Sequence, residues 1–178
     1  MKLTVKRGLA DFGLLVLRLA LGLDMAYHGA QKLFGEPVGP WFTEHLKTGE
    51  DAVAPQVQAT LEARIGGFAK YLGEGFGPDK PGLGLPYPEI NAWVAACTEF
   101  GAGILVAIGL LTRFGALGLA VAMGVASFLA HPYVWDQRSG GMELTAVLMC
   151  MAVALVFTGP GRLSLDGLFF GRNTVDSE

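Results

Sequence analysis

The stretch from Gly8 to Gly35 constrains the fold of this chain most strongly. It is apolar enough and long enough to cross a lipid bilayer, yet its polar side chains include Arg18, Asp24, His28, Gln31 and Lys32. A charged residue at the centre of a membrane helix costs about 3 kcal/mol on insertion scales, so it usually faces the bundle interior and has a partner there. We therefore predict that this stretch is the polar helix of a membrane bundle, and that the other helices supply its partners.

The composition agrees with a membrane location. Hydrophobic residues make up 52% of the chain and charged residues only 16%, whereas soluble domains are about 25% charged. The formal net charge of −3 gives no basic surface of the kind that binds nucleic acid. The lipid bilayer is thus the expected surrounding, and no nucleic-acid partner is expected.

Four segments approach the length of about 20 residues that a membrane helix needs. They predict an all-α, integral membrane four-helix bundle, formed as a single domain over residues 1–178, with helices at about 8–33, 90–111, 114–130 and 142–158. The connection 36–89 is too long for a bare loop. Within it, residues 55–72 carry apolar side chains at helical spacing, which predicts an amphipathic helix that caps the bundle. Residues 73–88 are rich in Gly and Pro and predict a turn segment.

Basic residues near the helix ends predict the orientation. With an even number of spans, six of them fall on one side: Lys2, Lys6, Arg7, Arg113, Arg162 and Arg172. We therefore expect a multi-pass protein of the inner membrane with both termini in the cytoplasm. Arg18 and Asp24 interrupt the first apolar run, which favours a retained helix over a cleaved signal peptide.

The other helices offer partners for the polar side chains of the first. Counting 1.5 Å per residue from the cytoplasmic ends places Arg18 and Glu99 at roughly 15–18 Å, which predicts a buried ion pair at mid-membrane. The same count places four further residues at roughly 22–30 Å, where they predict a cluster open to the outer side: Asp24, His28, His131 and Glu143. The pair could equally fix helix register or serve a function. His28 is the best functional candidate because imidazole titrates near neutral pH.

Other kinds of site have little support in the sequence. Cys97 and Cys150 lie in apolar runs without a CxxC motif, which favours two small buried side chains. The alternative is a disulfide, which needs Cα atoms within about 7 Å. No metal-ligand spacing, nucleophile elbow or phosphate-binding loop occurs, so we predict no metal or flavin site and identify no catalytic residue.

Several short motifs together resemble the DoxX family of membrane proteins. In the first helix these are Arg18, Gly22, His28-Gly29 and Lys32. Further along they are Glu99 with Gly101 and Gly103, then Gly109 to Arg113, Gly140 to Glu143, and Gly159 to Gly161 through Asp166. The resemblance covers most of the chain and weakens over residues 36–81.

The resemblance implies a four-helix membrane protein that works with quinone. Named relatives are subunits linked to thiosulfate:quinone oxidoreduction, and others join membrane oxidoreductase complexes in thiol and oxidative-stress defence. On this basis the chain is expected to be a subunit of a quinone-linked oxidoreductase with a redox-protein partner. The residues expected to bind the cofactor are Arg18, Asp24, His28, Glu99, His131 and Glu143. Two alternatives stay open: a non-catalytic scaffold subunit, and a small proton-linked transporter, which four helices would form as a homo-oligomer.

Overall fold

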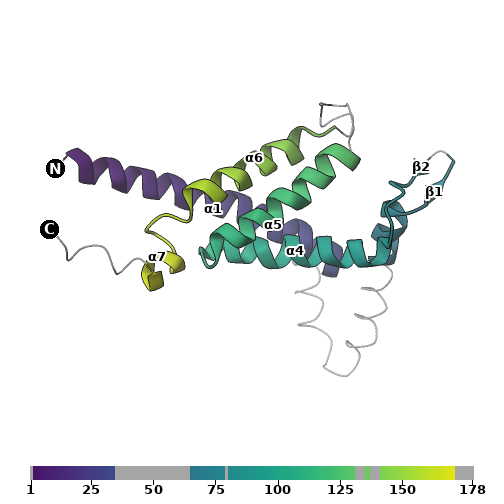
Figure 1. Ribbon diagram of the computed structural model, residues 1–178, viewed down its shortest axis with the longest axis horizontal. Coiled ribbons are helices and arrows are strands. Elements are labelled where there is room, and N and C mark those ends of the chain that lie inside the picture. Colours follow the sequence, from purple (N-terminus) through teal and green to yellow (C-terminus); the bar gives the residue numbers. More distant parts are fainter. Residues whose placement is uncertain (1, 35–64, 79, 131–134, 137–140, 171–178) are drawn as a thin grey trace, which may run out of the picture. The chain divides into compact units, whose positions relative to one another are not determined.

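A computed structural model describes residues 2–34, 65–78, 80–130, 135–136 and 141–170 (Figure 1). Its elements are α1 (Lys2–Phe34), β1 (Gly75–Gly77), β2 (Lys80–Pro81), α4 (Pro88–Ile108), α5 (Thr112–Val125), the π-helical turn η2 (Ala126–Ala130), α6 (Glu143–Thr158) and α7 (Leu165–Phe170). Residues 65–72 are also helical. The all-α prediction is confirmed, because within these described ranges only the short β1–β2 pair departs from it.

The long helices follow the predicted apolar runs closely. α4 and α6 begin and end within three residues of the predictions, and α5 continues through η2 over the predicted third segment. Two helical stretches are long and apolar enough to cross a membrane, Pro88–Ile108 and Thr112–Leu129, while the apolar helix Glu143–Thr158 is shorter. The four-span bundle therefore stays a prediction.

The chain divides into two compact units, Met1–Ala26 with Thr98–Glu178 and Tyr27–Cys97. In the first unit α5 and α6 lie side by side (Figure 1). Its core is built from α1, α4, α5 and α6 and comprises Leu21, Met25, Val106, Ala116, Leu119, Met123, Leu148, Ala152 and Leu155. The apolar faces of four helices thus meet in one continuous core.

Glycines bring the backbones of α1 and α4 into direct contact in this unit. A Cβ atom added to Gly103 would lie 2.5 Å from the backbone nitrogen of Ala26, and one added to Gly22 would lie 2.6 Å from that of Ala107. Small residues permit such close approach, which supplies packing between helices where water does not drive association. The contact fixes the register of the two helices.

In the second unit the described part of the amphipathic segment is helical, as predicted, whereas its role as a cap of the bundle stays a prediction. Ile65 and Leu72 are buried on helical residues 65–72, whereas residues 55–64 of the predicted helix lie outside the described ranges. The ammonium nitrogen of Lys32 lies 4.7 Å from the ring centroid of Phe68, within the range of a cation–π interaction. The predicted turn segment contains the antiparallel pair β1–β2, in which Gly75 lies opposite Pro81.

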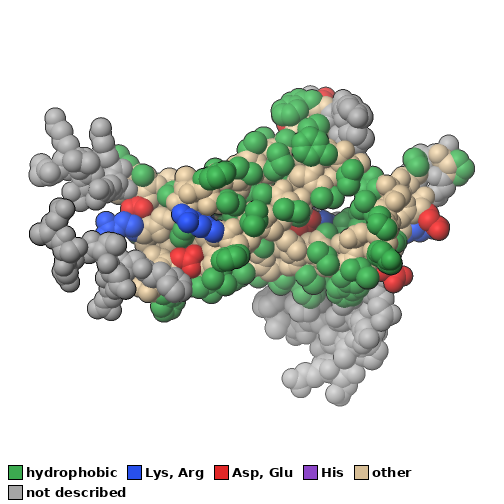
Figure 2. Space-filling model, viewed as in Figure 1, with side chains coloured by type: hydrophobic (Ala, Val, Ile, Leu, Met, Phe, Trp, Pro, Cys, Tyr) green, Lys and Arg blue, Asp and Glu red, His purple; other side chains and the backbone are tan. Residues whose placement is uncertain are grey.

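The outer surface of the helices is apolar, and buried polar residues lie inside. Phe114 on α5 is 76% exposed and Phe157 on α6 is 78% exposed, whereas Thr112 and Ser127 are fully buried. Figure 2 shows hydrophobic side chains across the visible face of these helices. Large exposed apolar areas mark contact with a protein partner or a membrane.

The two cysteines correct one prediction. Cys97 and Cys150 are free thiols, and both are exposed rather than buried. The prediction of two buried side chains was wrong because an apolar run does not identify the inward face when the outer surface is itself apolar.

The α1–α4 contact generates a prediction with a matched control on one helix. Gly103→Ala should lower the free energy of unfolding by about 1–3 kcal/mol, because the new methyl group meets backbone atoms that have no room to move. At Gly101 an added Cβ would find no atom within 4 Å, so Gly101→Ala should be neutral or stabilising by up to about 1 kcal/mol. Denaturant titration in detergent micelles measures both, and equal effects of the two variants would contradict the contact.

Candidate functional site

Arg18 lies where three segments of the first unit meet. Its side chain is only 1% exposed, and its Nη2 donates a hydrogen bond to the carbonyl oxygen of Leu163. The guanidinium also packs on Gly109, where an added Cβ would collide with Nη1. Gly109 has a φ of 75°, a conformation that glycine adopts without strain. Glycine at this turn therefore provides both the backbone conformation and the space for Arg18.

Asp166 completes the start of α5 from a distant part of the chain. Its Oδ1 accepts a hydrogen bond of 2.8 Å from the backbone N–H of Leu111, and its Oδ2 accepts one of 2.9 Å from that of Thr112. The residue at the N-cap position of α5, Leu111, has no side chain that can cap. The carboxylate of Asp166 instead accepts hydrogen bonds from two backbone N–H groups at the start of α5 that have no partner within the helix. Its negative charge also interacts favourably with the positive end of the helix dipole.

We call Arg18, the turn 109–111 and the segment 163–166 the junction. The backbone N–H of Asp166 donates to the carbonyl of Gly109 over 2.8 Å, and the carboxylate charge of Asp166 acts on the Arg18 guanidinium. Among the described residues, Nε and Nη1 of Arg18 have no hydrogen-bond partner. The opposite charge of Asp166 thus offsets part of the desolvation of a cation that is only partly hydrogen-bonded.

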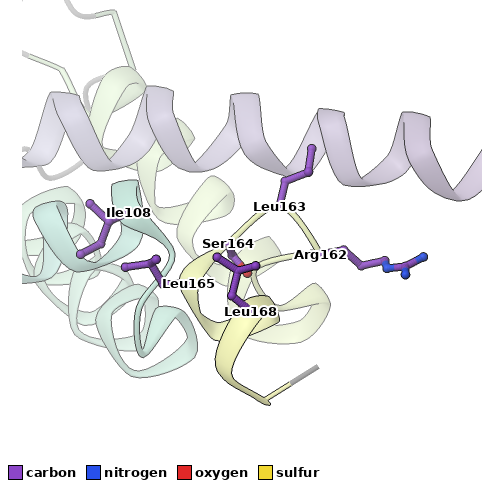
Figure 3. Close-up of a pocket in the computed structure, with 6 residues that line it drawn as sticks. All are labelled: Ile108, Arg162, Leu163, Ser164, Leu165 and Leu168. Carbon is purple, nitrogen blue, oxygen red and sulfur yellow. The ribbon is translucent and has the colours of Figure 1, made fainter. Parts of the chain in front are cut away.

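The chain that follows α6 is held by further hydrogen bonds. The backbone N–H of Arg162 donates to Oδ1 of Asp11 over 3.0 Å, and the hydroxyl of Ser164 accepts a hydrogen bond of 2.9 Å from the N–H of Gly167 at the start of α7. Beside it lies a groove lined by Ile108, Arg162, Leu163, Ser164, Leu165 and Leu168 (Figure 3). The lining is mostly apolar, with Arg162 at one end.

The structure corrects the predicted Arg18–Glu99 ion pair. Both side chains are buried, but Arg18 packs on Gly109, which follows Glu99 by ten residues along α4, or about 15 Å at the rise of an α-helix. The prediction was wrong because it counted depth from equivalent helix ends. α1 begins at Lys2 and reaches the level of the α4–α5 turn only at Arg18.

The remaining predicted residues differ in burial. Glu99 is 4% exposed, Asp24 and His28 are half-buried, and Glu143 is exposed in the first turn of α6. The His28 ring lies 6.0 Å from that of Tyr27 in an edge-to-face arrangement. His131 lies outside the described ranges. No group of three or more His, Cys, Asp or Glu side chains that could hold a metal ion occurs within the described residues.

Asp166 is the residue of the junction whose role the sequence analysis did not predict. Its motif contributed to the family resemblance, but no role followed from it. The available signal was indirect: the predicted third helix begins after Leu-Leu-Thr-Arg, which offers Thr112 but no acidic or amide cap. An uncapped helix start indicates that a distant residue satisfies its N–H groups.

Comparison with known proteins gives two matching family models and two similar proteins. The model described as DoxX matches residues 13–132, and that described as TQO small subunit DoxD matches residues 91–176. An uncharacterized protein of Haemophilus influenzae is 32% identical over 91 residues, which cover 47% of this chain and 60% of that protein. The inner membrane protein YphA of Escherichia coli is 32% identical over 111 residues, which cover 57% of this chain and 78% of that protein. The chain thus spans less than two thirds of the Haemophilus protein, and no solved structure matches.

The capping role of Asp166 is directly testable. Asp166→Ala should lower the free energy of unfolding by about 1–2 kcal/mol because it removes both hydrogen bonds to the start of α5, and Asp166→Asn should lose less because one acceptor oxygen remains. Glu74 is exposed, so Glu74→Ala is a matched control expected to stay within about 0.5 kcal/mol. Chemical unfolding in micelles measures all three variants, and an Asp166→Ala effect as small as the control's would refute the cap.

A double-mutant cycle tests the electrostatic interaction between Arg18 and Asp166. Arg18→Met and Asp166→Asn should be non-additive by about 0.5–3 kcal/mol, with the double variant less destabilised than the sum, because each change alone leaves the other charge uncompensated. Arg18→Met combined with Glu74→Ala should be additive. Additivity in both cycles would show that the two charges do not interact.

Proposed function

The chain belongs to the DoxX family, and on this premise we propose that it is an integral membrane subunit of a quinone-linked oxidoreductase complex. In this proposal one domain spans the inner membrane and binds quinone, while a redox protein partner supplies or receives the electrons. The chemistry concerned is thiol, sulfur or oxidative-stress redox metabolism.

The apolar exterior supports the membrane part of the proposal. Phe114, Leu117 and Val121 follow one another on the outer face of α5 and are all exposed, an arrangement that water would disfavour and lipid would not. The similar Escherichia coli protein is named an inner membrane protein. We infer that α1, α4, α5 with η2, and α6 cross the membrane, with the junction and both termini on the cytoplasmic side, where Arg113 and Arg162 satisfy the bias for basic residues.

The match to the TQO small subunit model over residues 91–176 supports the link to quinone. The observation that carries the proposal is the burial of Glu99 in the apolar helix α4. A quinone site needs a mostly apolar environment with one or two hydrogen-bonding groups. Quinone supplies two-electron, two-proton redox chemistry when bound, and a carboxyl group can donate to its carbonyl or accept from the quinol hydroxyl.

We assign Glu99 as the main hydrogen-bonding group, with Asp24 as a secondary candidate because it belongs to the same unit and is half-buried. His28 and His131 stay candidates from the sequence. Glu143 is less suited because it is exposed in the first turn of α6. Arg18 is left out of the direct binding set, because its Nη2 donates to the Leu163 carbonyl and its guanidinium packs on Gly109, ten residues beyond Glu99.

A non-catalytic scaffold is the second candidate function, and the junction favours it. Arg18 is buried and joins α1 to the turn 109–111 and the segment 163–166, as expected for a buried ionic group that fixes one arrangement of helices. In this case Glu99 would also serve structure alone.

Quinone titration separates the two candidates. The purified protein in nanodiscs should bind a short-chain quinone analogue, detected by quenching of tryptophan fluorescence and by a rise in Tm. Glu99→Gln should weaken binding of the quinol form of the analogue about tenfold or more, because an ionised carboxylate accepts a stronger hydrogen bond from the quinol hydroxyl than a neutral amide does. Glu89→Gln is the matched control, since Glu89 is exposed on the same helix, and it should leave the dissociation constant unchanged.

Two outcomes would reject the quinone proposal. One is the absence of a titratable signal in the folded wild-type protein, and the other is equal affinity in Glu99→Gln and Glu89→Gln. The scaffold would then be favoured if Glu99→Leu folds and still supports assembly of the membrane complex.

A further inference from the structure

The groove beside α7 is lined mainly by apolar side chains and has one basic residue, Arg162, at one end. Ile108, Leu163 and Leu168 line it and are all exposed, with Leu168 at 71%. Its volume is about 370 Å³. In Figure 3 the residues run from Ile108 through Leu165 and Leu163 to Arg162, whose guanidinium extends away from the apolar residues. The groove is therefore amphipathic along its length.

The groove lies where two candidate membrane spans end. Ile108 is the last residue of α4, and α5 begins at Thr112 after a turn of three residues. The end of a span is the level at which hydrocarbon gives way to lipid headgroups. Leu168 and Phe169 of α7 are exposed at this same end of the unit, as expected for apolar side chains that contact the membrane interface.

Two guanidinium groups lie near the α4–α5 turn and the start of α7. Arg113 and Arg162 are both exposed. Arg113 lies beside Gly159, where an added Cβ would be 3.2 Å from its Nε, and Gly159 precedes Arg162 by three residues. The backbone of Arg162 is held by Asp11, which leaves its side chain unconstrained by that bond. Guanidinium groups bind phosphate oxygens in pairs of parallel hydrogen bonds.

We propose that this groove binds a phospholipid with an anionic headgroup. One acyl chain lies along Ile108, Leu165 and Leu168, and the headgroup phosphate is bound by Arg162 with Arg113 nearby. The apolar lining favours a lipid over a free phosphate ion, because only the lipid fills it. The proposal rests on the membrane placement of the proposed function but not on quinone binding.

Lipid binding to the purified full-length protein tests the proposal. Native mass spectrometry should show preferential binding of phosphatidylglycerol over phosphatidylcholine by the wild-type protein. Arg162→Gln and Arg113→Gln should each weaken phosphatidylglycerol binding about fivefold, as expected for one basic residue at an anionic interface. Lys70 is a basic residue in the other unit and is exposed, so Lys70→Gln is the charge-matched control and should bind as wild type.

A second variant tests the apolar part of the groove. Leu168→Ser should weaken binding of both lipids without changing the preference between them, because it removes contact with the acyl chain only. Glycerophosphoglycerol, the headgroup without acyl chains, should not compete with phosphatidylglycerol at equal concentration.

The proposal is overturned if the wild-type protein shows no preference between the lipids, or if Lys70→Gln loses as much affinity as Arg162→Gln. Competition by the headgroup alone would assign a soluble anion site instead. The Tm of each variant in phosphatidylcholine checks folding, and if Arg162→Gln is unfolded, Arg162→Lys should fold and retain the preference. Quinone affinity should be the same in Arg162→Gln and wild type, so failure of one proposal is separable from failure of the other.

Discussion

A cation buried in an apolar helical bundle must find its polar partners within the protein, and the first unit is arranged around this requirement. Arg18 reaches the carbonyl of Leu163 and packs on the backbone of Gly109. Asp166 faces it with the opposite charge while accepting hydrogen bonds from the start of α5. Arg18 and Asp166 together therefore connect the first helix, the α4–α5 turn and the chain that follows α6, which are far apart in the sequence.

The buried polar groups of the first unit lie at two levels along α4, the junction at the end of the helix and Glu99 further along it. The junction lies at the end of α4, where Asp166 accepts hydrogen bonds from the start of α5 and Arg18 donates one to Leu163. Glu99 lies about 15 Å further along α4 at the rise of a helix and is also buried. An ionisable side chain within an apolar membrane helix is a candidate for function. The junction and the residue proposed to bind quinone thus lie at different levels of one bundle.

The sequence predicted the helices well because apolar runs and their flanking Gly and Pro residues are local signals. It failed where the outcome depends on tertiary geometry. The Arg18–Glu99 pairing required the position at which α1 meets the α4–α5 turn, and no local pattern gives that. The cap of α5 by Asp166 joins residues 55 positions apart. The exposure of Cys97 and Cys150 could not be predicted because hydropathy does not distinguish the inner face of a helix from its outer face when both are apolar.

The cap on α5 has a consequence for biosynthesis. Leu111 precedes the carboxylate that accepts its N–H by 55 residues, a delay of about 3–11 s at translation rates of 5–20 residues per second. During that interval the α4–α5 turn is exposed without its acceptor, and Arg18 lacks its counter-charge. The nascent chain therefore lacks these contacts until the segment with Asp166 has been synthesised. In a prematurely terminated chain this end of the bundle would have no cap, and quality-control proteases would have access to it.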